Sequence, residues 1–117
     1  MAEDIPTLTR SDIDSSVRRS DRPAIVVFTA EWAENAEAYS DVLDELQEEF
    51  GESIALFRVD VDDEGRLAND FHIADVPTFI GFMHGDAMYR VDSTDLETPE
   101  DARQVAEKLM ALPGAAA

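Results

Sequence analysis

The chain has 117 residues, of which 44% are hydrophobic and 31% charged, and it contains no cysteine. This length and apolar share suit one folded domain, and they exclude a disordered tail, a collagen and a disulfide-stapled scaffold. Nine basic residues against 27 acidic ones give a formal net charge of -18, which disfavours nucleic acids and anionic membranes as partners. No stretch of about 18 apolar residues is present to span a membrane, and the acidic start Met1–Asp4 lacks the apolar run of a secretory signal. We therefore expect a monomeric, cytoplasmic protein.

Apolar periodicity predicts strands and helices that alternate along the chain. Ala24–Phe28 is an unbroken apolar run after Pro23, which is typical of a strand buried on both faces. The segment His84-Gly85-Asp86 is a tight-hairpin signal, and Thr98 predicts a helix start with a threonine N-cap. The expected elements are, in chain order, a strand over 5–8, a weak helix over 11–19, a strand over 24–28, a long helix up to Gly51, a strand over 53–59, a short helix over 64–72, strands over 78–83 and 87–91, and a helix from Thr98 onward.

This order, β-α-β-α-β-α-β-β-α, predicts an α/β fold. Strand-helix-strand pieces favour parallel pairing through right-handed crossovers, whereas the hairpin strands must be antiparallel, so we expect a mixed central β-sheet with helices on both faces. Residues 1–112 are expected to form a single domain. Residues 113–117 are expected to be a frayed tail, because Pro113 and Gly114 stop the preceding helix.

Two short motifs carry a resemblance to a known family. Ala30-Glu31-Trp32 follows a buried strand and runs into a long amphipathic helix, and this resembles the active-site segment of the thioredoxin family. In that family two redox cysteines follow the tryptophan, and their positions here are Ala33 and Ala36. Val76-Pro77-Thr78 resembles the cis-proline turn that faces the redox site, at the spacing of a thioredoxin without insertions. The resemblance covers residues 5–112.

The resemblance implies a thioredoxin fold and a groove for a polypeptide client or partner, lined by Trp32, Val61, Val76 and Pro77. It implies no cofactor. The chain departs from the family at other positions too, since Val27 stands where a buried aspartate often serves as proton shuttle. Arg58 stands where a lysine often partners that aspartate. Thiol-disulfide exchange needs a thiolate, which alanine cannot supply, so we expect the domain to be redox-inactive.

Three interpretations of the two alanines stay open. The first is a natural binding module that lost its catalysis. The second is a protein-disulfide oxidoreductase whose active-site cysteines were replaced at Ala33 and Ala36. The third is a scaffolding module that uses another face. The spread of carboxylates, with Lys108 as the single lysine, favours a protein from a salt-rich cytoplasm over an ordinary acidic one.

Other polar residues give weaker signals, and we expect no metal site. The segment 60–65 places Asp60, Asp62 and Glu64 at positions 1, 3 and 5 of an EF-hand loop, but Phe71 takes position 12, where a glutamate is needed. Asp62 or Asp63 is expected to cap the short helix instead. His72 and His84 lie on different elements without catalytic partners, and Glu31, Glu34 and Glu37 are interpreted as surface charge rather than as acid-base groups.

Overall fold

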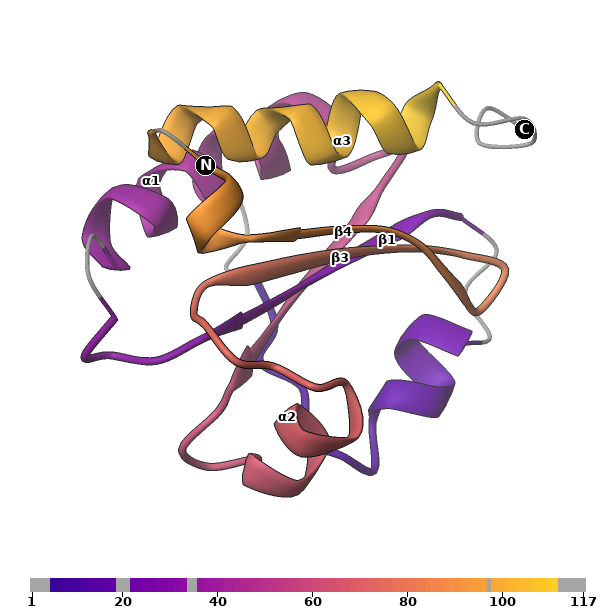
Figure 1. The fold of residues 1–117 in the computed structure, drawn as a ribbon. Coiled ribbons are helices and arrows are strands. Elements are labelled where there is room, and N and C mark those ends of the chain that lie inside the picture. Colours follow the sequence, from indigo (N-terminus) through magenta and orange to yellow (C-terminus); the bar gives the residue numbers. More distant parts are fainter. Residues whose placement is uncertain (1–4, 19–21, 34–35, 97, 112–117) are drawn as a thin grey trace.

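The computed structural model describes residues 5–18, 22–33, 36–96 and 98–111, and it has a mixed four-stranded sheet with helices on both faces (Figure 1). The α/β architecture expected from the sequence is confirmed. The elements are the π-helical turn η1 (Asp14–Arg18), β1 (Ala24–Thr29), α1 (Ala36–Phe50), β2 (Ala55–Asp60), α2 (Gly65–Asp70), β3 (Thr78–Met83), β4 (Asp86–Asp92), the 3-10 turns η2 (Ser93–Asp95) and η3 (Pro99–Ala102), and α3 (Arg103–Met110).

The strands lie in the order β2-β1-β3-β4, with β1 near the middle of the sheet. β1 is parallel to β2 and antiparallel to β3, and β3 is antiparallel to β4. The register pairs Val27 with Arg58 across β1 and β2, and Phe28 with Thr78 across β1 and β3. The carboxyl ends of β1 and β2 therefore meet the amino end of β3 at one edge of the sheet.

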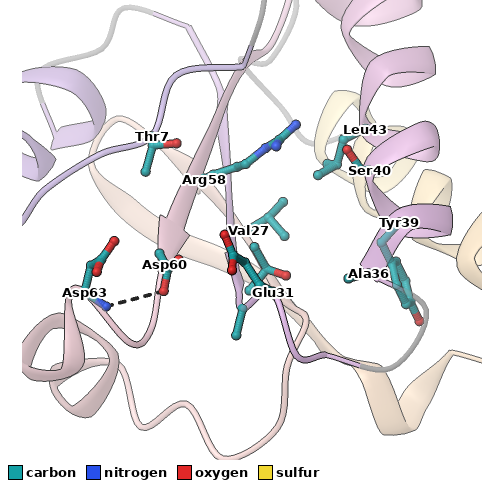
Figure 2. Close-up of a pocket in the computed structure, with 12 residues that line it drawn as sticks. Thr7, Val27, Glu31, Ala36, Tyr39, Ser40, Leu43, Arg58, Asp60 and Asp63 are labelled. Atoms are coloured by element: carbon teal, nitrogen blue, oxygen red, sulfur yellow. Dashed lines mark hydrogen bonds between the residues drawn. The ribbon is translucent and has the colours of Figure 1, made fainter.

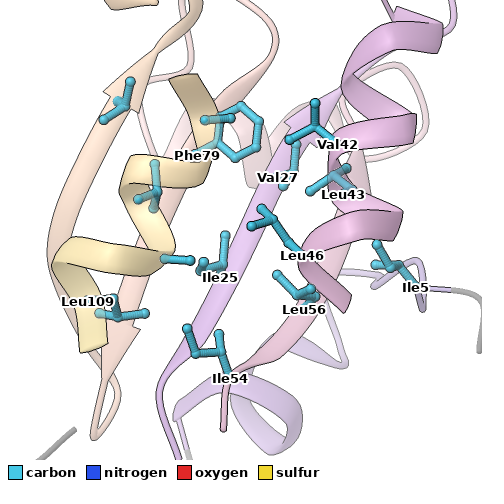
Figure 3. Close-up of a cluster of buried hydrophobic side chains, with 14 of the residues drawn as sticks. Ile5, Ile25, Val27, Val42, Leu43, Leu46, Ile54, Leu56, Phe79 and Leu109 are labelled. Atoms are coloured by element: carbon cyan, nitrogen blue, oxygen red, sulfur yellow. The ribbon is translucent and has the colours of Figure 1, made fainter. Parts of the chain in front are cut away.

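Side chains of β1 alternate between two hydrophobic layers. Ile25 and Val27 face the layer under α1 and α3, which also contains Leu46, Phe79 and Leu109 (Figure 3). Val26 and Phe28 face the layer under α2 and η1, as expected for a strand buried on both faces. Apolar residues at helical spacing on α1 and α3 close the first layer.

The expected first strand is shorter than predicted. Thr7 forms a single parallel bridge to Arg58, with the Arg58 amide donating to the Pro6 carbonyl at 2.9 Å and the Leu8 amide donating to the Arg58 carbonyl at 2.8 Å. Because Pro6 has no N–H to donate, the ladder does not continue into a full strand. The expected tail, residues 113–117, lies outside the described residues, as does Leu112 at the expected end of the domain.

Local polar contacts define the turns and helix ends. The hairpin after β3 is confirmed: His84 and Gly85 have φ of 53° and 86°, the positive values that a two-residue type I′ turn requires. The Thr98 amide donates to Asp101 Oδ2 at 3.0 Å, so the expected N-cap forms as a capping box. Arg103 on α3 forms an ion pair with Glu49 on α1, which joins the two helices of the first layer.

Candidate functional site

Three chain segments converge at the edge where β1 and β2 end and β3 begins. The Val61 amide donates to the Thr29 carbonyl at 3.0 Å, which holds the end of β2 beside the end of β1. On the other side of β1, the pairing of Phe28 with Thr78 places Pro77 next to the residues that follow β1. Loops at such an edge carry side chains that the rigid sheet holds in place.

Trp32 is the most exposed large hydrophobic residue of the described chain, with 67% of its surface accessible. Its indole Nε1 donates a hydrogen bond of 2.7 Å to Asp62 Oδ2, in the turn after β2. This contact brings Trp32 to the turn that carries the partly buried Val61. The ring therefore has a fixed polar end and an open apolar face.

The turn after β2 differs in detail from the expectation. Asp60 Oδ1 accepts hydrogen bonds from the amides of Asp62 and Asp63, at 2.8 and 3.3 Å. The N-cap position of α2 is Glu64, whose side chain makes no capping bond, so the prediction that Asp62 or Asp63 caps this helix is wrong. The backbone turns immediately after β2, and Asp60, the last residue of β2 and two positions before Asp62, accepts the hydrogen bonds of the turn amides.

The segment before β3 carries the other two expected groove residues. The Val76–Pro77 peptide bond is cis, as the family resemblance implied, with Pro77 buried and Val76 partly exposed. Buried Thr78 donates its hydroxyl to the Asp75 carbonyl at 2.6 Å. Within the described chain, the backbone of Val76 forms no hydrogen bond to another backbone group. An amide and a carbonyl therefore remain free at the edge of the site.

Arg90 on β4 fixes this segment from outside, and the sequence reading missed its role. Its guanidinium donates to the carbonyls of Phe71 and His72, at 2.6 and 2.8 Å, and pairs with Asp92 at 3.2 Å. Asp92 in turn accepts a 3.2 Å hydrogen bond from the Thr78 hydroxyl. The signal in the sequence was the spacing of Arg90 and Asp92, which places both side chains on one face of a strand.

The two alanines lie beside Trp32. Ala33 is 7% exposed, and Ala36, which is partly exposed, begins α1. Together with Glu37 and Asp41 they line a hollow of about 550 Å³. Methyl groups in this hollow offer neither a nucleophile nor a metal ligand. Glu31 and Glu37 are exposed, in keeping with surface charge, and Glu34 lies outside the described residues.

A separate cavity of about 380 Å³ lies between α1 and the ends of β1 and β2 (Figure 2). Val27, Leu43 and Arg58 line it, and burial raises the pKa of the Tyr39 phenol at its side, with the negative charge of Asp101 adding to the effect. The sequence reading noted Val27 and Arg58 only as departures from the family. It did not predict the cavity, which depends on how α1 sits over the sheet.

The described residues offer little support for metal or triad chemistry. They contain no group of three or more histidine, aspartate or glutamate side chains placed to hold a metal ion. His84 lies in the hairpin at one end of β3, whereas His72 lies near the other end, where Arg90 contacts its carbonyl. Among the described helices, none is long and apolar enough to cross a membrane.

Comparisons with known proteins agree on one family. The family model named Thioredoxin matches residues 4–108. Thioredoxin Y, a chloroplastic protein of Oryza sativa subsp. japonica, is 30% identical over 84 residues, which cover 72% of this chain and 50% of the relative. The thioredoxin of Mycolicibacterium smegmatis is 30% identical over 95 residues, covering 78% of this chain and 85% of the relative. The thioredoxin of Pyropia yezoensis is 29% identical over 89 residues, which cover 76% of this chain and 80% of the relative. The chain spans about half the length of the chloroplastic relatives it matches.

Proposed function

Because this chain belongs to the thioredoxin family and contains no cysteine, we propose that it is a redox-inactive domain that binds an extended polypeptide. The fold expected from the resemblance is the fold of the family. The chemistry is different, since thiol-disulfide exchange proceeds through attack of a thiolate on a disulfide, and neither Ala33 nor Ala36 can supply the sulfur. What the site retains is the capacity to bind.

The observation that carries this proposal is the exposure of Trp32. A tryptophan with 67% of its surface in water, held at one end by the hydrogen bond to Asp62, is an unpaired apolar surface of fixed orientation. Aromatic side chains of this kind anchor many protein interfaces, because they contribute large contact area at low conformational entropy cost. The proposed groove combines Trp32 with Val61, Val76 and Pro77.

The backbone at Val76 supports an extended client in particular. Its amide and carbonyl form no backbone hydrogen bond within the described chain, so they can pair with a strand laid along the groove. Strand addition of this kind takes affinity from backbone hydrogen bonds and selectivity from side-chain pockets. Trp32 and Val61 would then contact alternate side chains of the client.

Peptide binding by a Trp32→Ala variant tests the proposal. A panel of fluorescently labelled, extended peptides is titrated with the wild-type and variant proteins, and anisotropy gives the dissociation constants. The variant should bind weaker by about 2 kcal/mol or more, the loss expected for an aromatic anchor. Intrinsic Trp32 fluorescence of the wild type should change on binding, since the exposed ring becomes covered.

Met88→Ala is the matched control, because Met88 is the other large hydrophobic residue that the described chain exposes, at 50%, and it lies on β4. Its removal should leave peptide affinity unchanged. Equal affinity of the Trp32→Ala and wild-type proteins would reject the groove and favour the scaffolding interpretation, in which another face carries the function.

A second candidate function is thiol-disulfide exchange by a parent protein with cysteines at Ala33 and Ala36. The position of Ala36 at the first residue of α1 favours it, since a helix N-terminus lowers the pKa of a nearby thiol from about 8.5. A double variant, Ala33→Cys with Ala36→Cys, separates the two candidates. Our proposal predicts slow reduction of insulin disulfides at neutral pH, because exposed Glu31 and Glu37 disfavour the thiolate and Val27 offers no proton shuttle. Brisk reduction would favour the enzyme.

The charge of the chain supports a salt-rich cytoplasm as its location, and we propose a monomer, since a net charge of -18 opposes self-association. Like charges repel over about 30 Å at 0.01 M salt and over about 3 Å at 1 M. The thermal midpoint should therefore rise from low salt to molar KCl. A midpoint that stays flat or falls would remove the proposal of a halophilic origin.

A further inference from the structure

The cavity of about 380 Å³ between α1 and the sheet has the size of a small-molecule site. It lies where the parallel strands β1 and β2 end, a position at which α/β proteins commonly bind ligands. Val27 and Leu43 form buried apolar walls, whereas Glu31 and Asp63 are exposed, so the cavity opens to solvent on the acidic side.

Arg58 is the unusual residue of this cavity. Its Nε atom is buried and has no hydrogen-bond partner, and within the described chain its side chain forms no ion pair. An unsatisfied buried N–H of a charged group is costly, and 27 acidic residues were available to neutralise it. Register explains why no carboxylate of the described residues does so, because the neighbour of Arg58 on β1 is the apolar Val27. The guanidinium is therefore ready to accept an external anionic group.

Positive and negative charge occupy different parts of the cavity. Figure 2 shows the guanidinium of Arg58 extended toward Ser40 and Leu43 of α1, whereas the carboxylates of Glu31 and Asp60 lie near the strand ends. Asp60 uses Oδ1 for the two amides of the turn after β2, and no hydrogen bond to its Oδ2 is found among the described residues. The cavity thus has a cationic inner end, apolar walls and an acidic mouth.

We propose that this cavity binds a small zwitterionic aminocarboxylic acid, with its carboxylate on Arg58 and its ammonium group at Asp60 and Glu31. Such a ligand supplies the acceptor that the buried Nε–H lacks and a donor for the free carboxylate oxygens. Its short methylene chain would contact Val27 and Leu43. This site is separate from the proposed peptide groove, and the proposal does not depend on that function.

The charge distribution selects the zwitterion over simpler ions. A plain carboxylate satisfies Arg58 but meets repulsion from Glu31, Asp60 and Asp63 at the mouth. A plain ammonium ion satisfies the mouth but leaves the guanidinium without a partner. Only a molecule that carries both groups, separated by a few carbon atoms, complements both ends.

Calorimetry and NMR with simple aminocarboxylates test the proposal. The wild-type protein is titrated with glycine, β-alanine, 4-aminobutyrate and 6-aminohexanoate, and in parallel with acetate and methylammonium. One of the aminocarboxylates should bind about tenfold more tightly than either single ion, the factor of one charge-assisted hydrogen bond. Its binding should shift the Arg58 Nε–H resonance. Acetate that binds as tightly as the best aminocarboxylate, or no binding of any aminocarboxylate, would overturn the proposal.

Two variants and a control variant test which residue binds the carboxylate of the ligand and which binds its ammonium group. Arg58→Met keeps the unbranched apolar stem of the side chain and removes its charge, and it should weaken binding about tenfold or more. Asp60→Asn keeps an oxygen for the amides of the turn, and it should weaken the aminocarboxylate while strengthening acetate. Arg66→Met, at an exposed site on α2, should change neither affinity. Thermal midpoints verify folding, and opposite-sign effects of Asp60→Asn cannot come from unfolding. Unchanged affinities in both site variants would reject the assignment.

Discussion

The two faces of the sheet are filled in different ways, although β1 supplies neighbouring residues to both. Under α2, Phe71 packs against Phe28 and Phe82 with ring centroids 5.4 and 5.9 Å apart, and this layer is closed by aromatic rings. Under α1, the layer leaves a cavity of about 380 Å³ beside Val27, with a charged side chain in it. Both layers stabilise the fold, but only the layer under α1 leaves unfilled space at one end.

Side-chain size accounts for the difference. Ala36 and Ser40 of α1 and Val27 of β1 have short side chains, and they line the cavity at the strand ends without filling it. Farther along the same layer, Leu46 and Phe79 close the core completely. The cavity is thus confined to one end of an otherwise packed layer.

The largest expected difference in stability is between two single variants that each bury a carboxylate on β1. Ile25 and Val27 face the same layer, but Ile25 lies in the closed part whereas Val27 borders the cavity and is paired in register with Arg58. Ile25→Asp should cost more than about 5 kcal/mol, enough to unfold a typical domain. Val27→Asp should cost no more than about 3 kcal/mol, because the guanidinium and cavity water accompany its charge. Circular dichroism shows whether Ile25→Asp folds at all, and urea denaturation gives the value for Val27→Asp.

The Val27→Asp variant also tests the proposed ligand site. A carboxylate at position 27 would occupy Arg58 from within the chain and should abolish aminocarboxylate binding. Equal destabilisation by Ile25→Asp and Val27→Asp would contradict the distinction between a closed and an open part of this layer.

The closed aromatic layer should be sensitive to a loss of volume. Phe28 is fully buried and contacts the ring of Phe71, so Phe28→Ala should destabilise the fold by about 3–5 kcal/mol through lost burial and a residual cavity. Chemical denaturation measures the change. Met88→Ala on exposed β4 is the control and should stay within about 0.5 kcal/mol of wild type. A small effect of Phe28→Ala would contradict the tight packing of the aromatic layer under α2.

The smallest effect should appear at alkaline pH on the α1 side. Burial, with the charge of Asp101, raises the pKa of Tyr39 above its usual value of 10.0, so the folded state favours the neutral phenol. The resulting stability is complete below pH 10.0 and is lost as the pH rises toward the folded pKa, since the unfolded chain ionises first. Tyr39→Phe keeps the ring contact with Phe79 and should flatten this part of the stability profile. Equal slopes above pH 10.0 in both proteins would contradict this account.

Much of the fold follows from patterns that are local in the sequence. Three local features were predicted correctly, because each depends on residues adjacent in the sequence. They are the apolar run of β1, the His84-Gly85 turn and the Thr98 cap. The first strand was overestimated, since Pro6 limits it to one bridge. The placement of the four groove residues came from a family resemblance rather than from periodicity.

The functional features that sequence reading missed depend on long-range placement. The cavity forms where Thr7 and the end of β2 meet β1 and α1, so its lining comes from parts of the chain that are distant in sequence. The resemblance singled out Val27 and Arg58 as departures from the family, but the sequence did not show that the Arg58 Nε atom is buried without a partner. The hydrogen bonds from Arg90 to the carbonyls of Phe71 and His72 also join residues far apart in the chain, and the local spacing of Arg90 and Asp92 indicates only that they share a strand face.

Arg90 has a consequence for how the binding edge could be changed. It donates from β4 to the carbonyls of Phe71 and His72, so a distant strand holds the start of the segment that leads to Pro77. Ala74 and Asp75 are exposed and lie between this anchor and Pro77, so their side chains can be exchanged while the backbone keeps its anchor. A library randomised at these positions, with Arg90 and Asp92 retained, would turn the natural edge into a selectable recognition surface.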